Sequence, residues 1–245
     1  MVQSIASPKQ YVLELEEKVD NHIRQRVLGG EFMRELMAGT LPLEAFQGWS
    51  RNWYTYALEI NTAVSCLYHR FGWLWRKYPD FEDFITERVS EEAGQPGPGG
   101  HIRTFETLGA AIGLTREDLT TQQLLPGARA GIDFYVRVIF EATPHEIGAV
   151  LLNEKAHGSI VFGEIYQALK RPPYNLSEEA LLYFSLHSIA DMEHGDENRQ
   201  FFTKLLEREP LTERVGWGME YTTMTWAEMF ARFFEETYAA YRPRG

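Results

Sequence analysis

The sequence contains 245 residues, of which 44% are hydrophobic and 24% charged, a balance that excludes disordered, collagen-like and low-complexity proteins. Its 24 Lys and Arg residues against 35 Asp and Glu residues give a net charge of -11, which disfavours nucleic acid and anionic membranes as partners. A small-molecule substrate is the expected partner. Cys66 is the single cysteine, no apolar stretch approaches roughly 18 residues, and the N-terminus lacks a signal-peptide layout. We therefore expect a cytoplasmic protein without disulfides or transmembrane helices.

Apolar residues recur every three or four positions along nearly the whole chain, which predicts an all-α fold. Proline and glycine breakers divide the chain into about eight helices. The breakers are Gly29-Gly30, Leu41-Pro42, Phe71-Gly72, Pro79, the stretch 94–100, Pro126-Gly127, Pro144, Pro172-Pro173 and Pro210. Thr115 and Asp118 predict a capping box at one helix start, and Ser177 predicts another start. Because no repeat or linker interrupts the pattern, residues 1–245 are expected to form a single domain, a helical bundle.

The segment from Tyr174 to His194 predicts a long helix with metal-ligand side chains on one face. Helical spacing places His187, Asp191 and His194 in line with apolar positions such as Phe184. Burying a carboxylate with two imidazoles is unfavourable unless a partner compensates, and a divalent cation is such a partner. A surface stripe or an Asp–His hydrogen-bond network are the alternatives for this pattern.

Two further segments contribute candidate ligands. The helix after Pro144 carries one charge, Glu154, on an otherwise apolar face, and a buried Glu is normally paired or metal-bound. Glu91 and Glu92 end one predicted helix, and His101 begins the next across a Gly- and Pro-rich loop. Helical phase does not separate Glu91 from Glu92, and a solvated helix end is the alternative. The candidates together match a carboxylate-bridged two-metal site, for which oxygen and imidazole donors favour iron, with manganese also compatible.

A ferritin-like bundle is one architecture for such a site, because it pairs helices that carry Glu-x-x-His motifs. Glu154-Lys-Ala-His157 and Asp191-Met-Glu-His194 are similar to those motifs. The ferritin-like scheme also needs a helix with a lone Glu between them, whereas the chain turns at Pro172-Pro173 and continues directly into the second motif. The topology therefore disfavours a ferritin-like bundle.

The full pattern instead resembles the haem-oxygenase-like di-iron oxidases, relatives in fold of the TenA and PqqC proteins. The matching residues are Glu91-Glu92-Ala93-Gly94 through His101, then Glu154, and finally His187-x3-Asp191-x2-His194, within a similarity that extends from about residue 39 to 198. The likeness is strongest to the CADD-like branch, which includes a chlamydial p-aminobenzoate-forming enzyme. That branch has the segment Asp-Glu-Glu-Asn-Gly where this chain has Ser90 to Gly94. This match selects Glu91 over Glu92 as the metal ligand.

The resemblance implies two iron ions, with O2 as co-substrate. The implied ligands are Glu91, His101, Glu154, His187, Asp191 and His194. It also implies a peroxo-di-iron(III) intermediate that oxidises an amino acid, amine or fatty acid, with an external electron donor as a further partner. The tyrosine that the CADD-like branch consumes as its own substrate aligns near Met33, and its helper lysine aligns near Glu164. An external small-molecule substrate is therefore expected.

Alternatives to the di-iron interpretation remain. Segment 124–136 and Glu193-His194-Gly195 also resemble PqqC, which uses O2 without a metal. A non-catalytic helical interaction module would be favoured by an exposed Glu154. TenA-type hydrolysis needs a nucleophilic cysteine, whereas Cys66 lies mid-helix, as structural thiols do.

Two features bear on partners without deciding them. Segment 216–234 is rich in Trp, Met and Phe, and predicts either the face of a homodimer or an element that closes the bundle. His157 and Arg51 are candidates for substrate contact, although ordinary core packing with Arg51 at the surface is the alternative.

Overall fold

The computed structural model describes residues 7–120, 123–209, 211 and 213–242; of residues 190, 191 and 213–217 it describes the backbone alone. Its helical segments are α1 (Pro8–Ile23), the π-helix η1 (Arg24–Leu28), α2 (Glu31–Ala38), α3 (Leu43–Arg70), α4 (Gly72–Lys77), α5 (Pro79–Gly94), α6 (Gly100–Ala111), α7 (Arg116–Thr120), α8 (Pro126–Glu141), α9 (Pro144–Leu151), α10 (Asn153–Lys155), the π-helix η2 (Ala156–Phe162), α11 (Gly163–Leu169), α12 (Leu182–Arg208) and α13 (Glu213–Tyr241). The described residues contain no β-strand, and the all-α prediction is confirmed.

The chain has more helical segments than the predicted eight because single predicted helices are subdivided. The helix expected after Pro144 consists of α9, α10, η2 and α11 in succession. A π-helix holds one residue more per turn, so a period of 3.6 does not describe it.

Local signals at two helix starts had different outcomes. At Thr115 the capping box is confirmed, since the Thr115 hydroxyl accepts from the Asp118 amide and the Asp118 carboxylate accepts from the Thr115 amide. At Ser177 the hydroxyl accepts from the Ala180 amide at 3.2 Å, yet turns follow and α12 begins only at Leu182. The prediction of a helix start at Ser177 is therefore wrong by several residues.

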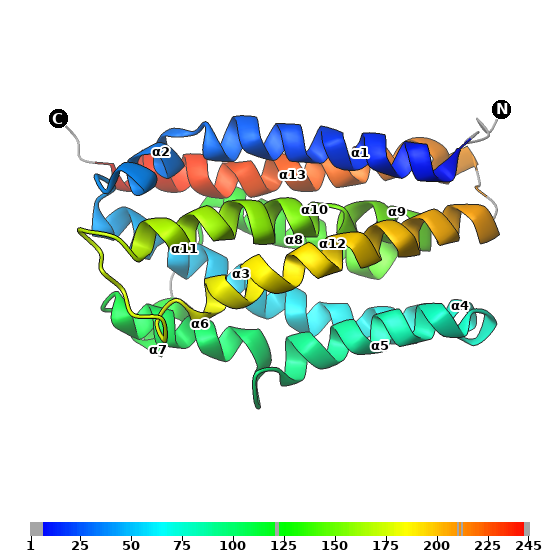
Figure 1. The fold of residues 1–245 in the computed structure, drawn as a ribbon, viewed down its shortest axis with the longest axis horizontal. Helices are drawn as coiled ribbons and strands as arrows, with labels where there is room; N and C mark the ends of the chain where they lie inside the picture. The colour runs from blue at the N-terminus through cyan, green and yellow to red at the C-terminus, as the bar shows by residue number, and fades with distance from the viewer. Residues whose placement is uncertain (1–6, 121–122, 210, 212, 243–245) are drawn as a thin grey trace.

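Long helices lie along the longest axis of the molecule (Figure 1), with α1 beside α13 and with α5 and α6 on the opposite side. Helix α12 crosses between these layers and packs against α1, α9, η2 and α6. The centre is aromatic: the ring of Trp49 stacks on Trp53, with centroids 5.5 Å apart. Helix α13 buries Phe230 and Phe234 in this core, so segment 216–234 closes the bundle.

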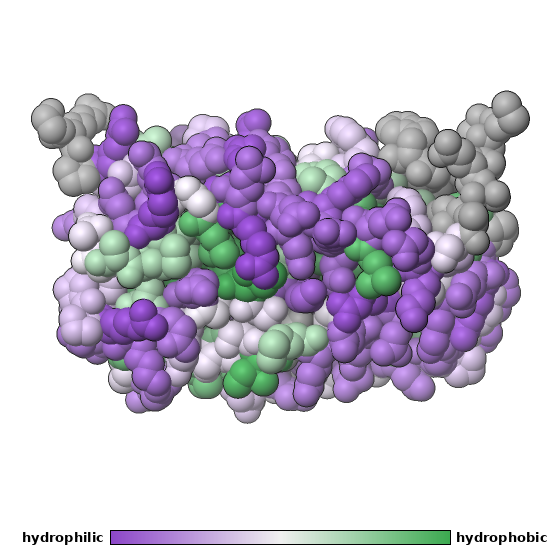
Figure 2. Space-filling view, turned by 45° about the horizontal axis from the view of Figure 1, so that its top comes forward, coloured by the Kyte–Doolittle hydropathy of each residue, from purple (hydrophilic) through white to green (hydrophobic). Residues whose placement is uncertain are grey.

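The face seen in Figure 2 is mostly hydrophilic, with small apolar areas between hydrophilic residues. Among the described residues, no helix combines the length and hydropathy that a membrane span requires.

Candidate metal centre

The loop between α5 and α6 brings the end of one helix against the start of the next. Gly100 has a φ of 59° and begins α6, immediately before His101. A Cβ atom on Gly100 would lie 1.8 Å from the backbone oxygen of Glu92. Only glycine allows both this left-handed conformation and this approach. Gly100 thereby fixes how closely Glu92 and His101 can face one another.

Replacing Gly100 with alanine is expected to separate these two side chains. The clash with the Glu92 carbonyl and the strained φ should lower the free energy of unfolding by about 2 kcal/mol, and iron affinity should fall with it. Urea unfolding and iron titration measure the two effects. Gly97→Ala is the matched control, because a Cβ there meets nothing within 4 Å. Wild-type values for Gly100→Ala would contradict the role assigned to this loop.

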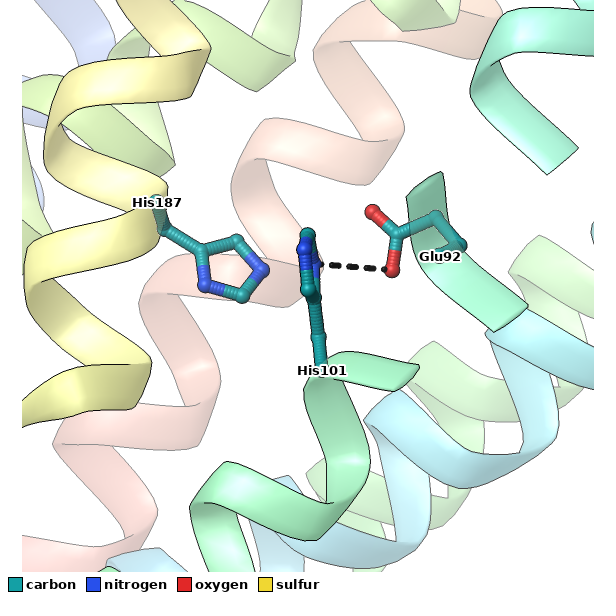
Figure 3. Close-up of side chains that lie close together, drawn as sticks. All are labelled: Glu92, His101 and His187. Atoms are coloured by element: carbon teal, nitrogen blue, oxygen red, sulfur yellow. Dashed lines mark ion pairs between the residues drawn. The ribbon is translucent and has the colours of Figure 1, made fainter. Parts of the chain in front are cut away.

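Glu92, His101 and His187, which we call the Glu92 triad, converge from α5, α6 and α12 (Figure 3). One ligand atom from each lies within 4.8 Å of the other two. The Nδ1 atom of His101 is 3.3 Å from Oε2 of Glu92, and the imidazole rings of His101 and His187 are 4.7 Å apart. Both histidines are less than 9% exposed. A carboxylate and two imidazoles at this spacing suit a divalent transition metal.

The orientation of His187 is fixed by the backbone of its own helix. Its Nδ1 donates to the carbonyl oxygen of Tyr183 at 2.7 Å, which leaves Nε2 unprotonated and able to bind a metal. Burial, together with the neighbouring His101, lowers the pKa of His187 from 6.5 to about 4. Burial raises the pKa of Glu92, but the hydrogen bond from His101 and the charges of His101 and His187 together outweigh it, so the net pKa is lowered. At neutral pH His187 is therefore neutral and Glu92 ionised, the states that bind a metal.

The lowered pKa of His187 predicts how acid affects the iron-free protein. The unfolded chain takes up this proton near pH 6.5 and the folded chain only near pH 4, so stability is full above 6.5 and falls between these values. The loss should approach about 3 kcal/mol. Urea unfolding of chelator-treated protein across this pH range measures it, and His187→Gln should reduce the slope. An equal slope in wild type and variant would exclude His187 as its source.

A second set of ligand side chains, Glu91, Glu154 and His194, is called the Glu91 group. The His194 imidazole lies between the two carboxylates, with Nε2 3.0 Å from Oε2 of Glu91 and Nδ1 3.6 Å from Oε1 of Glu154. The side-chain amide of Asn198 donates to Glu154 and to the Leu151 carbonyl. The side chain of Asp191, a predicted ligand, lies outside the described residues.

Arg88 on α5 is the cation beside the Glu91 group. Its guanidinium lies 3.5 Å from Glu154, 3.1 Å from Glu197 and 4.0 Å from Glu91, and its side chain is 8% exposed. Burial raises the pKa of Glu154, but the positive charge of Arg88 and the hydrogen bonds from His194 and Asn198 together outweigh it. The pKa therefore lies well below the usual range. Glu154 is thus ionised, and the side chain is only 18% exposed.

Five of the six predicted ligands can be placed, and they divide between the two sets. The preference for Glu91 over Glu92 does not describe the triad, because Glu92 faces His101 and His187 whereas Glu91 faces His194. Adjacent residues on α5 thus serve different sets.

Sequence reasoning missed Arg88 and Asn198. A signal was present in the spacing, since Arg88 precedes Glu91 and Glu92 by three and four positions, and Asn198 follows His194 by four. A cavity lies beside the site. His157 is among the residues that line it, whereas Arg51 is not. The Nδ1 of His157 donates to the Asn153 carbonyl at 2.9 Å.

The arrangement fits iron. The Glu92 triad and the Glu91 group offer oxygen and imidazole donors, and Glu92, His187 and Glu154 line one cavity. Such donors suit Fe or Mn, and neither set contains a sulfur donor. The negative charge of Glu154 raises the pKa of Glu92 slightly, against the larger effects of His101 and His187. This geometry can hold a transition metal ion next to a cavity.

Residues 47–226 match the family model described as "Iron-containing redox enzyme". The chain is 30% identical over 127 residues to the pyrroloquinoline-quinone synthase of Ectopseudomonas mendocina, covering 50% of this chain and 48% of that protein. It is 23% identical over 195 residues to the 4-aminobenzoate synthase of Chlamydia pneumoniae, covering 79% and 83%. The chain thus spans about half the length of the first of these curated relatives.

Solved structures show a similar fold. A domain of unknown function with a heme oxygenase-like fold from Shewanella denitrificans matches with a TM-score of 0.73 and 18% identity, covering 94% of this chain and 93% of that one. A TenA homologue from P. horikoshii matches with a TM-score of 0.68 and 15% identity, covering 96% and 99%. At these identities the likeness concerns the fold alone, which is haem-oxygenase-like.

Proposed function

This chain belongs to the family of iron-containing redox enzymes, and on that basis we propose that it is a non-haem di-iron oxidase that uses O2 to oxidise a small organic substrate. The observation that carries the proposal is the Glu92 triad, with His194 between the carboxylates of Glu91 and Glu154 as a second set of donors. The proposal includes an external electron donor and a homodimer. Light scattering would measure the mass of the particle in solution and so test the dimer.

The residues have separable roles in this function. The Glu92 triad would hold one iron, and the Glu91 group, with Asp191, would hold the second. When bound, the irons supply the electrons and open coordination positions that O2 activation requires. The chain's own contribution is orientation: Tyr183 fixes the tautomer of His187, and Asn198 fixes the carboxylate of Glu154. The cavity walls exclude water from the reacting substrate.

Anaerobic titration of chelator-treated protein with Fe(II), followed by O2 exposure, tests this function. We expect about two irons per chain and O2 consumption that depends on them. Parallel titration with Mn(II) decides between the two metals. His69→Ala is the matched control, because this exposed histidine at the end of α3 should not change the stoichiometry. Protein that retains no iron above background would reject the proposal.

A second candidate is a metal-free oxidase similar to the pyrroloquinoline-quinone synthases. The 30% identity to the Ectopseudomonas mendocina enzyme favours it. In that case O2 would react with a bound substrate while His157 and His187 serve as proton acceptors. O2 consumption that persists with substrate after complete iron removal would support this candidate over the di-iron oxidase.

A further inference from the structure

Helices α10 and α12 are joined at the metal centre and also on a second face. At the metal centre, the side-chain amide of Asn198 donates to Glu154. Lys155 and Arg199 directly follow these two residues in the chain. Because consecutive helical residues point about 100° apart, the side chains of Lys155 and Arg199 leave the same two helices in a different direction. Each helix thus carries a metal-centre residue next to a cation that faces elsewhere.

Glu16 of α1 receives both of these cations. The Nη1 atom of Arg199 lies 2.8 Å from Oε1 and 3.0 Å from Oε2 of Glu16, and Nζ of Lys155 lies 3.7 Å from Oε1. The Glu16 side chain is only 7% exposed, so this carboxylate is a buried charge with two partners. Lys155 also lies 3.5 Å from Asp20, one turn further along α1. Since α1 packs along α12 and also contacts α10, Glu16 bridges the two helices from outside (Figure 1).

The backbone that carries Glu154 is not part of a continuous α-helix. Helix α10 consists of Asn153–Lys155 alone, and the π-helix η2 follows it directly. Short and irregular helical segments are stabilised mainly by tertiary packing rather than by their own hydrogen bonds. The position of Glu154 therefore depends on contacts with neighbouring helices, whereas His194 lies within the long helix α12.

Gly195 determines how closely α10 approaches α12. A Cβ atom on Gly195 would lie 3.0 Å from Cβ and 3.1 Å from Cδ of Lys155, so the stem of the lysine lies against the glycine backbone. Gly195 directly follows His194, whose Nδ1 is 3.6 Å from Oε1 of Glu154. The ion pair between Lys155 and Glu16 holds the lysine stem in this place, and with it the separation of the two ligand side chains.

We propose that Glu16 is a positioning residue of the metal centre. By joining Lys155 and Arg199 it holds α10 against α12, and so sets the separation of Glu154 and His194, which are donors to the second iron. The inference rests on the proposed function for the metal, but the ion pairs themselves involve no metal. Glu16 is not among the described residues that line the cavity, so it acts through the two cations.

Stepwise Fe(II) binding to Glu16→Gln tests this role, because glutamine keeps the shape of the side chain and removes its charge. Anaerobic titration of the full chain with a competing chelator gives the two affinities separately. We expect the affinity for the second iron to fall about tenfold and that for the first iron, at the Glu92 triad, to stay within about twofold. Unchanged affinities would overturn the proposal. Equal losses at both irons would also overturn it, because a residue that only stabilises the fold leaves their ratio unchanged.

Amide hydrogen exchange of chelator-treated protein gives a readout that needs no metal. In Glu16→Gln the amides of residues 153–160 should exchange about tenfold faster, because α10 and η2 lose their connection to α1. Helix α5 is the internal reference, since its main contacts are with α3, α4, α6 and α12, and its exchange should not change. Equal acceleration throughout the chain would assign Glu16 to global stability and overturn the positioning role.

Further variants test the connection itself. Arg199→Gln should act as Glu16→Gln does, and the double variant should be no worse than the weaker single variant, because both changes remove one interaction. Additive losses would contradict a shared interaction. Lys155→Met keeps the stem over Gly195 without its charge, and it replaces Glu16→Gln if that variant does not fold. Glu17→Gln is the matched control, since Glu17 is the adjacent, exposed carboxylate of α1.

The outcomes separate this proposal from the di-iron function. Faster exchange confined to residues 153–160, in a protein whose wild type binds no second iron, would reject the di-iron function and retain Glu16 as the residue that positions Glu154. Binding of two irons with affinities that Glu16→Gln leaves unchanged would do the reverse.

Discussion

Replacing His187 with alanine should lower the affinity for the more tightly bound iron by about a hundredfold or more. Loss of a residue that only orients a metal ligand typically costs 10- to 100-fold in affinity, and loss of the ligand itself should reach at least the upper value. His187 also has a fixed tautomer, so its Nε2 needs no reorganisation to bind. Anaerobic Fe(II) titration with a competing chelator measures the change.

The same variant distinguishes the two ligand sets. Because the Glu91 group does not include His187, His187→Ala should retain weaker binding of a second iron and should lose the first. Imidazole added to the solution is expected to fill the space and restore part of the affinity. His69→Ala should match the wild type. Loss of both irons together with a lowered melting temperature would show that His187 acts through the fold rather than as a ligand.

Helical periodicity was sufficient to predict which of these side chains point inward. The face shared by Phe184, His187 and His194 is buried, and Glu154 is only 18% exposed, as their phases predict. The exposed Glu154 that would have favoured a non-catalytic interaction module is not observed. Burial of polar residues at helical spacing is a local property, so the sequence carries it directly.

Periodicity could not assign Glu91 and Glu92, because both positions face ligands. They lie at the end of α5, where one carboxylate turns to His101 on α6 and the other to His194 on α12. The choice depends on how the two helices pack and on the approach that Gly100 allows, which is a tertiary property. The resemblance to relatives selected Glu91 alone, whereas the structure places Glu91 beside His194 and Glu92 beside His101.

The π-helix η2 is a second feature that sequence patterns do not reveal. It begins directly after α10, which carries Glu154, and it contains His157. The additional residue per turn shifts the phase of the side chains, and π-helical turns are frequent at functional sites. His157 lines the cavity, whereas Arg51, the other candidate for substrate contact, does not.

Arg88 was the residue of the site that the sequence predicted least, since a basic residue on an amphipathic helix is normally expected at the surface. Its long side chain instead carries the guanidinium to three carboxylates and Asn198, while its position is 7% exposed. Without iron, Arg88 is the main positive charge that keeps Glu154 ionised. This cation therefore compensates in the iron-free protein for charge that iron would neutralise.

Arg88→Met should consequently destabilise the iron-free protein by about 3 kcal/mol, because removing one partner of a buried ion pair leaves the other charge uncompensated. The loss should be smaller in the iron-loaded protein, where the metal replaces the missing positive charge. Urea unfolding with a chelator and with anaerobic Fe(II) measures both values. Arg137→Met is the matched control: its pair with Glu141 is exposed, so this variant should unfold at close to the wild-type urea concentration. An equal loss with and without iron would mean that Arg88 stabilises the fold through packing, and that the Glu91 group does not exchange this cation for a metal.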